Sequence, residues 1–425
     1  MQTYKMCEGV DLHTIEAPKF KTNIISLFFN IPLKRDTVTS AALIPSVMKR
    51  GTKEHETFTD IVKYLEDMYS ASFGAGVRFK GDGEVLGFSI EYIRDKFIGE
   101  NLTTKIIEFL KSFIFKPLVI DGGFKAEYVD GEKENLKNAI LSLINDKKEY
   151  AEVKCREIMF GKEGYGMYEA GYVEDLSKIN PENLYEFYQN VINEAHVDIF
   201  ASGNFEGEDI VQTLKDAFGG CLNPRHTPHI KTQIAVSDKT DVVRVVEEID
   251  VVQSKLCMGF LCNTNPANDE YYALMLASCI FGGSPFSKLF NNVREKLSLA
   301  YYAVARTERF KSVMTISSGI ETEKYQAAYD EIMVQFEKMK SGDFDDGEIN
   351  AGKKYLATGL NSMKDSLRTM EDYYLSQTIM GYSQDIDELL NCISNVNADD
   401  IKKAFQKIKL STVFFLKGNS KGENE

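Results

Sequence analysis

The most constraining feature of this 425-residue sequence is that its second half repeats the pattern of its first. Residues 179–204 predict a capped helix, a turn and an apolar strand that stops at Gly-Asn, and residues 396–419 predict the same order. The strand-like segments 20–30 and 252–263 also match, and a helical pattern follows each. Self-similarity at this domain-sized spacing indicates duplication rather than a solenoid. We therefore expect two copies of one unit.

The boundary between the copies follows Gly219-Gly220, where the sequence becomes rich in turn-forming residues and proline. We expect an N-terminal domain at residues 1–220, a linker at 221–240 and a C-terminal domain at 241–425. The length of the chain also favours two domains over one core. The matching segments at the starts of the two copies lie farther apart in the sequence than the matching segments at their ends. The first copy is therefore longer than the second, which predicts an insertion in the first copy. We place it in an enlarged loop at residues 121–131.

Apolar alternation within each half predicts β-strands, for example at residues 83–93 and 312–320, interleaved with amphipathic helices. One such helix follows Thr57 and Asp60, which have the spacing of a capping box. Its buried stripe should comprise Ile61, Leu65, Met68 and Tyr69.

Composition excludes several classes of protein. The formal net charge of −14 argues against nucleic-acid binding, which needs clustered Lys and Arg. No apolar run approaches the roughly 18 residues that span a bilayer, and the N-terminus lacks the features of a secretory signal. Seven scattered cysteines do not form a disulfide framework, so a reduced cytoplasm is expected. Three of them lie inside apolar runs and should be core residues, namely Cys257, Cys262 and Cys279.

The segment 281–302, FGGSPFSKLFNNVREKLSLAYY, predicts a glycine turn, an amphipathic helix carrying Arg294 and an aromatic strand that starts near Tyr301. Two polar side chains at this spacing could converge on one substrate carbonyl. A solvated helix residue and a half-buried strand residue are the structural alternatives for these two positions. Gly282 and Gly283 are most simply explained by a tight turn.

A metal site elsewhere would have to use some of the five histidines, which are His13, His55, His196, His226 and His229. Glu54-His55 is the one Glu-His pair, but no histidine precedes it at the spacing of an inverted zinc motif. His226 and His229, with Cys221 nearby, could recruit metal, although a polar linker is the simpler interpretation. No paired C-x-x-C, H-E-x-x-H or Walker motif occurs.

The Arg-Tyr segment closely resembles the second-half signature of the pitrilysin/insulinase metallopeptidase superfamily, whose arginine and tyrosine at this spacing bind the scissile carbonyl. The resemblance covers nearly the whole chain, including the connecting stretch 160–188. It implies an α+β fold in which each half has a mostly antiparallel sheet with helices packed on one face, and the halves close around a chamber. Arg294 and Tyr301 then become catalytic candidates, and Gly282 and Gly283 become substrate-binding candidates.

Active members of this superfamily also carry H-x-x-E-H in their first half, shortly before a Gly-Thr pair. Aligned on Gly51-Thr52, this chain has Ala42 and Ser46 at the histidine positions and Pro45 at the glutamate position. A methyl group, a hydroxyl and an imide offer none of the imidazole, thiolate or carboxylate ligands that zinc needs. The sequence therefore predicts a degenerate zinc motif.

The third ligand of the superfamily is a glutamate on a later helix. Matching Glu132-Lys133 to its pattern puts Ala139 at that position. No metal or other cofactor is therefore expected in this chain.

In the smaller members of the superfamily, two polypeptides form one working peptidase, and in some bacterial pairs one subunit has lost the zinc motif but kept the Arg-Tyr pair. The resemblance implies that this chain is such a zinc-less subunit, with zinc only in its sister, an unstructured peptide or protein as substrate, and no nucleic-acid or membrane partner. The chain also resembles a bacterial zinc-less subfamily linked to modification of translation elongation factor P, through its overall pattern and residues 145–147.

Two other functions remain open at this stage. The chain could be a non-catalytic peptide-binding or assembly protein, including a homodimer, in which the Arg-Tyr pair has no chemical role. It could also be an independently active hydrolase, but no Ser or Cys lies in a recognisable nucleophile elbow.

Overall fold

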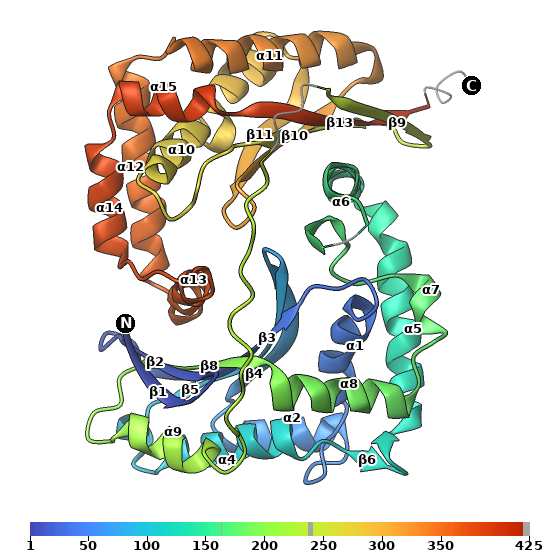
Figure 1. Cartoon of the computed structure of the whole chain (residues 1–425), viewed down its shortest axis with the longest axis vertical. Coiled ribbons are helices and arrows are strands. Elements are labelled where there is room, and N and C mark those ends of the chain that lie inside the picture. Colours follow the sequence, from blue (N-terminus) through green and yellow to red (C-terminus); the bar gives the residue numbers. More distant parts are fainter. Residues whose placement is uncertain (163, 237–240, 420–425) are drawn as a thin grey trace. The chain divides into compact units, whose positions relative to one another are not determined.

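The computed structural model describes residues 1–162, 164–236 and 241–419, and its contacts divide the chain into two compact units (Figure 1). Unit 1 comprises Met1–Leu141, Tyr168–Lys231 and Lys364–Ser383. Unit 2 comprises Ser142–Met167, Thr232–Met363 and the chain from Gln384 onward. Each unit thus includes a segment from the other half of the sequence. The domain limits 1–220 and 241–425 stay a prediction, and residues 237–240 of the expected linker lie outside the described part.

Unit 1 is built on a six-stranded sheet. Its strands lie in the order β1 (Gln2–Cys7), β2 (Val10–Glu16), β8 (His196–Gly203), β3 (Thr22–Pro32), β5 (Gly83–Ile93) and β4 (Ser72–Lys80). Neighbouring strands are antiparallel, except that β2 and β8 run parallel. A separate two-stranded ribbon is formed by β6 (Val119–Ile120) and β7 (Gly123–Phe124).

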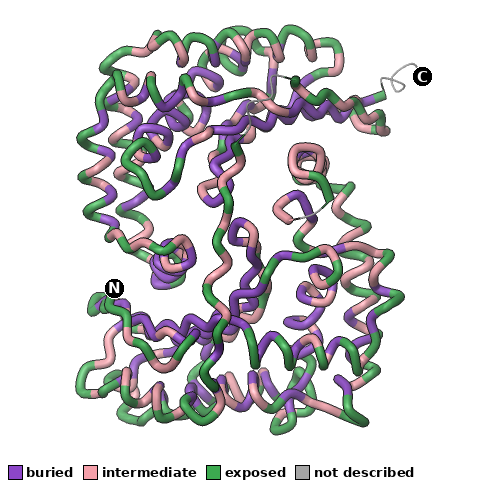
Figure 2. Tube along the Cα trace, in the orientation of Figure 1, coloured by how far each residue is buried: buried purple, intermediate pink, exposed green. Residues whose placement is uncertain are grey.

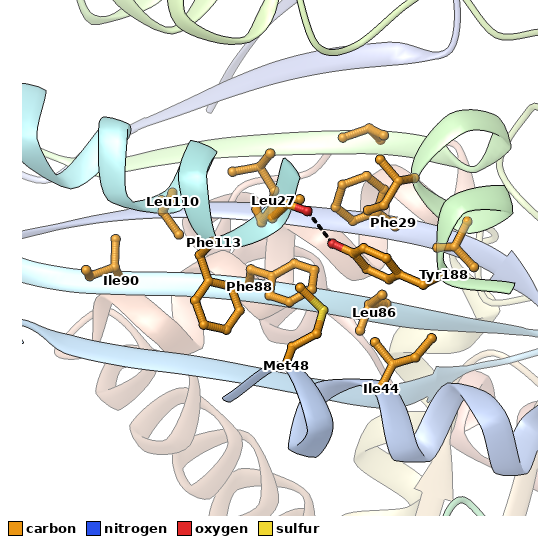
Figure 3. Packing of buried hydrophobic residues seen from close by; sticks show 14 of the residues in the cluster. Leu27, Phe29, Ile44, Met48, Leu86, Phe88, Ile90, Leu110, Phe113 and Tyr188 are labelled. Carbon is orange, nitrogen blue, oxygen red and sulfur yellow. Dashed lines mark hydrogen bonds between the residues drawn. The ribbon is translucent and has the colours of Figure 1, made fainter. Parts of the chain in front are cut away.

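Helices cover one face of this sheet and form the main core with it (Figures 1 and 3). The helices that contribute buried residues are α1 (Val38–Lys49), α2 (Phe58–Asp67), α4 (Leu102–Phe115), α5 (Ala126–Ser142), α7 (Val173–Leu176), α8 (Pro181–Glu194) and α9 (Ile210–Phe218). The short helix α3 (Asp95–Ile98) contributes none. In the core, the rings of Phe88 and Phe113 pack with their planes tilted by 58°, beside Met48 (Figure 3). The Tyr188 hydroxyl donates to the Ile114 carbonyl, so its polar end is paired despite burial.

Unit 2 has a five-stranded sheet. Its strands lie in the order β11 (Ala300–Glu308), β12 (Val313–Ile320), β10 (Ser254–Leu261), β13 (Lys409–Gly418) and β9 (Val243–Ile249), with only β13 and β9 parallel. Its helices are α6 (Lys147–Phe160), α10 (Glu270–Ser278), α11 (Tyr325–Ser341), α12 (Asp346–Met363), α14 (Ile386–Asn395) and α15 (Ala398–Gln406). Among the described residues of either unit, no helix combines the length and apolar character needed to cross a bilayer.

The two sheets confirm the predicted duplication and the α+β class. The order β2-β8-β3-β5-β4 in unit 1 corresponds to β9-β13-β10-β12-β11 in unit 2, and in both the parallel pair lies at the same end. The predicted loop at 121–131 is wrong, because the β6–β7 ribbon precedes a helix that starts at Ala126. The extra residues of the first copy include this ribbon, which has no counterpart among the described elements of the second copy.

The helix α2 confirms the expected capping box, in which the Thr57 hydroxyl accepts from the Asp60 backbone and the Asp60 side chain accepts from Thr57. Its predicted stripe is correct for Ile61 and Met68, which are buried, but wrong for Tyr69. The helix ends before Tyr69, whose φ of 57° is left-handed. The side chain therefore leaves the helical face and is 48% exposed.

The second face of each sheet is covered by one helix from the other half of the sequence (Figure 1). In unit 2, α6 packs on β10 and β13 through an apolar cluster that includes Cys155, Cys257 and Phe414. In unit 1, the corresponding helix is α13 (Leu367–Met380), which contacts β3 and β8. The strands β8 and β10 are consequently buried along their whole length (Figure 2).

Polar groups take part in the contact between α13 and its sheet. Asp372 accepts from Arg78 at 2.7 Å and from Lys80 at 2.8 Å. Glu371, which is 3% exposed, accepts from the Ser202 hydroxyl of β8 at 3.2 Å. Burial raises the pKa of Glu371 to about 7, because the hydroxyl and the nearby Arg78 only partly replace the lost hydration.

This raised pKa predicts that unit 1 loses stability as the pH rises. A carboxyl whose pKa is raised by folding stabilises the fold while it is protonated, so its contribution is lost as the pH rises from 4.5 through about 7. The whole effect is at most about 3 kcal/mol. In Glu371→Gln, which stays neutral, unfolding by urea at about pH 5 and about pH 8 should show a smaller loss of stability than in the wild type. Equal losses in both proteins would contradict the assignment.

Candidate functional site

The Arg-Tyr segment begins where α10 continues into a π-helical turn, η3 (Cys279–Gly283), and then into the π-helix η4 (Leu289–Lys296). Gly282 is buried, and a Cβ at this position would lie 2.7 Å from the Ala305 Cβ and 2.7 Å from Leu289 Cδ1. Only glycine therefore allows η3 to approach β11 this closely. This supports a packing role for Gly282, whereas substrate contact by Gly282 and Gly283 stays a prediction.

Arg294 lies on η4 with 45% of its side chain exposed. Its guanidinium lies 4.8 Å from the centre of the Phe290 ring, and its Nε is 3.3 Å from the Glu295 carboxylate. An ion pair this exposed contributes little energy, so it would not prevent the guanidinium from binding a ligand. Stacking on the ring restricts the side chain more than the ion pair does.

Tyr301 occupies a β-bulge. On β11, Ala300 pairs with Ile320 and Tyr302 pairs with Gly319, which leaves Tyr301 as the extra residue. Such a bulge redirects the side chain of the extra residue and is common beside active sites. Tyr301 is accordingly 57% exposed. Its hydroxyl is thus available at the start of the strand, on the same unit as Arg294.

The degenerate zinc motif lies on α1, whose apolar residues Ile44 and Val47 enter the core of unit 1. Ala42 and Ser46 lie on this helix, and Pro45 is buried within it. Proline removes a backbone donor, and none of the three side chains is a carboxylate or an imidazole. The superfamily's zinc therefore does not fit the motif positions of this chain.

The position of the third ligand is equally unsuited. Ala139 is exposed on α5 and carries only a methyl group. The nearby carboxylate of Glu132 is held by other residues: Arg50 lies 3.6 Å from one oxygen and the Asn135 amide donates to the other at 3.1 Å. The helix thus keeps an acidic residue, but this residue has a structural role.

Comparison with known proteins identifies the family. The family described as "Peptidase M16 inactive domain" matches residues 178–356. YmfF of Bacillus subtilis (strain 168), named a probable inactive metalloprotease, is 33% identical over 414 residues, which cover 96% of each chain. The chain therefore belongs to the M16, or pitrilysin-like, peptidase family and is a zinc-less homologue within it.

Solved structures support the same assignment. A conserved protein from Enterococcus faecalis V583 matches with a TM-score of 0.92 at 28% identity, over 99% of both chains. The peptidase M16 inactive domain from Pseudomonas fluorescens matches with a TM-score of 0.82 at 15% identity, over 100% of this chain and 99% of that one. At so low an identity, the second likeness concerns the fold alone.

One group of polar residues was not predicted as a site from the sequence. His196, Asp198 and His229 come together in unit 1, with their possible ligand atoms within 4.8 Å of one another. Sequence analysis treated His229 as part of a polar linker. The available signal was the alternation His196-x-Asp198, which places both side chains on one face of a strand, but it does not reveal that His229 returns to that face.

The packing role of Gly282 can be tested by replacing it with alanine. An added methyl group would overlap with Ala305 and Leu289, so Gly282→Ala should destabilise the protein by about 1–3 kcal/mol in urea unfolding. Gly359→Ala on α12 is the matched control, because a methyl group added there would have no atom within 4 Å. It should be neutral or stabilising by up to about 1 kcal/mol. An unchanged stability in Gly282→Ala would instead favour a role in substrate contact.

Proposed function

We propose that this chain is the zinc-less subunit of a two-chain, processing-peptidase-like metallopeptidase, in which it helps to bind the substrate peptide. The observation that carries this proposal is the contrast between its two halves. The motif helix α1 has lost every zinc ligand, whereas Arg294 and Tyr301 present polar groups to solvent. A chain with these features needs a partner that supplies the metal.

Arg294 and Tyr301 have the chemistry that binds a peptide carbonyl. A guanidinium offers several donors in a fixed plane, and a phenol offers one donor on a rigid ring. Both groups are suited to stabilise the negative charge that develops on a carbonyl oxygen during peptide hydrolysis. In this proposal they bind and orient the substrate, while cleavage takes place at the partner. A bacterial cytoplasmic location and a link to elongation factor P modification remain predictions from the sequence.

The first prediction from this proposal concerns assembly. The purified chain alone should cleave no unstructured peptide, and it should form a one-to-one complex with a zinc-bearing sister from the same family. Size-exclusion chromatography with light scattering measures the complex, and a fluorogenic peptide assay measures the activity. A chain that ignores the sister at micromolar concentrations would favour the alternative of a non-catalytic peptide-binding protein or homodimer.

The second prediction concerns the two polar residues. Within the complex, Arg294→Ala and Tyr301→Phe should each lower peptide turnover by about 100-fold, the usual cost of losing one donor to a developing oxyanion. Arg306→Ala on β11 and Tyr355→Phe on α12 are matched controls, since both residues are exposed and neither belongs to the proposed pair.

The control variants should keep wild-type turnover, and all four variants should keep the mass of the complex and its melting temperature. If Arg294→Ala and Tyr301→Phe are as active as the controls, the pair has no catalytic role. The chain would then act only by binding the peptide or the partner.

A further inference from the structure

Three of the five histidines converge with two aspartates on the face of the unit 1 sheet that lies opposite the main helical core. The strands β2 and β8 pair in parallel, with Asp11 beside Asp198. Alternation along these strands directs Asp11, His13, His196 and Asp198 to the same face, while the residues between them enter the core. His229 reaches this group from the extended segment that follows α9.

The distances within the group are short. His229 Nε2 lies 2.8 Å from Asp198 Oδ2, and His196 Nε2 lies 3.9 Å from Asp198 Oδ1 and 3.1 Å from Asp11 Oδ2. The imidazole rings of His196 and His229 have centroids 3.7 Å apart. Asp198 is 0% exposed and His196 is 5% exposed. The possible ligand atoms of His196, Asp198 and His229 therefore lie within 4.8 Å of one another, and Asp11 lies beside His196.

The orientation of His196 is that of a metal ligand. Its Nδ1 lies 3.2 Å from the Thr227 carbonyl, which can only accept, so Nδ1 carries a hydrogen. Its Nε2 faces the carboxylates of Asp11 and Asp198. Metal-bound histidines commonly donate their other nitrogen to a backbone carbonyl in this way.

Further side chains hold the carboxylates in place. Asp198 accepts from the Asn30 amide at 2.8 Å and bonds His13 Nε2 at 3.0 Å. Lys5 lies 3.0 Å from Asp11. Neighbouring side chains thus hold both carboxylates in place.

We propose that His196, His229, Asp198 and Asp11 form a binding site for a divalent transition-metal ion such as zinc. Two imidazoles and two carboxylates are a donor set that zinc accepts in a tetrahedron. With bonds of about 2.0–2.1 Å, neighbouring ligand atoms would be about 3.3 Å apart. The observed separations of 2.8, 3.1 and 3.9 Å lie on either side of this value.

This site differs from the degenerate zinc motif in position and in role. The motif lies on α1, which packs on the helical face of the sheet, whereas the proposed site is on the opposite face. Four protein ligands would leave no open position for substrate, so the metal would be structural. It would fasten the segment around His229 to the central strands. The expectation of a metal-free chain came from the motif positions and from a search of the histidines that favoured a polar linker for His226 and His229.

The test is a zinc titration of the full-length protein after treatment with a chelator and dialysis. Calorimetry should show one equivalent bound by the wild type, and cobalt, used in place of zinc, should give the visible absorption of a tetrahedral site. His229→Ala should bind at least about 100-fold more weakly, because it removes a direct ligand. His226→Ala is the matched control: it lies three residues away, 88% of its side chain is exposed, and it should bind as the wild type does.

A third variant separates the metal from the hydrogen bond. In His229→Gln the amide can still donate to Asp198 but is a poor zinc ligand, so zinc should raise the melting temperature of the wild type and of His226→Ala but not of this variant. The proposal is overturned if excess zinc does not bind the wild type. It is also overturned if the His229 variants bind zinc as tightly as the wild type, or if His226→Ala loses binding too, since zinc would then lie on surface histidines.

Discussion

Both sheets of this protein have two faces to cover, and this requirement organises the rest of the structure. The central strands β8 and β10 are buried along their whole length, so neither can have a face in water. Helices from the same half of the chain cover one face, and α13 and α6 cover the other. Each of these two helices comes from the opposite half of the sequence. Neither half of the sequence therefore contains everything that its own sheet needs.

The helices α6 and α13 each cover the second face of a sheet, but they contact it through different kinds of side chain. The helix α6 packs through small and apolar residues such as Cys155, whereas α13 adds hydrogen bonds and ion pairs to its buried apolar residues, including those of Asp372. A polar contact of this kind places charged groups where hydration is lost, which is why Glu371 keeps its proton to an unusually high pH. The same face of the unit 1 sheet carries the buried Asp198 and its histidines. Buried polar chemistry is thus concentrated on this face.

The packing of α1 explains how the motif positions can lack zinc ligands while the fold is kept. In α1 the side chains that matter for packing are apolar and point into the core, so Ala42, Pro45 and Ser46 could replace metal ligands without disturbing it. In the second half, the backbone around the Arg-Tyr segment departs from regular helix and strand geometry. The π-helical turns and the bulge at Tyr301 are departures from regular structure that expose two polar side chains. Such departures persist more easily where they have a function.

The sequence alone predicted much of the fold. Alternation and capping signals gave strands such as Gly83–Ile93 and the start of α2 at Thr57, because these features depend on neighbouring residues. The same local signals failed at Tyr69, where the helix ends one turn early in a left-handed conformation. They also failed at residues 121–131, where a short ribbon and a helix replace the expected loop. Both errors lie at the ends of elements, where local pattern is weakest.

The features of the candidate sites also fall into those that the sequence determined and those that only the tertiary structure determined. The sequence determined that the motif positions lack zinc ligands, since this follows from residue identity, and it singled out Arg294 and Tyr301 through a contiguous pattern. It did not determine that Tyr301 would occupy a bulge, or that Gly282 would be required by Ala305. Only the tertiary structure brought His196, Asp198 and His229 together, because the register of β2 with β8 and the return of a distant segment set those distances. Contacts between residues far apart in the chain have no local signature in a single sequence.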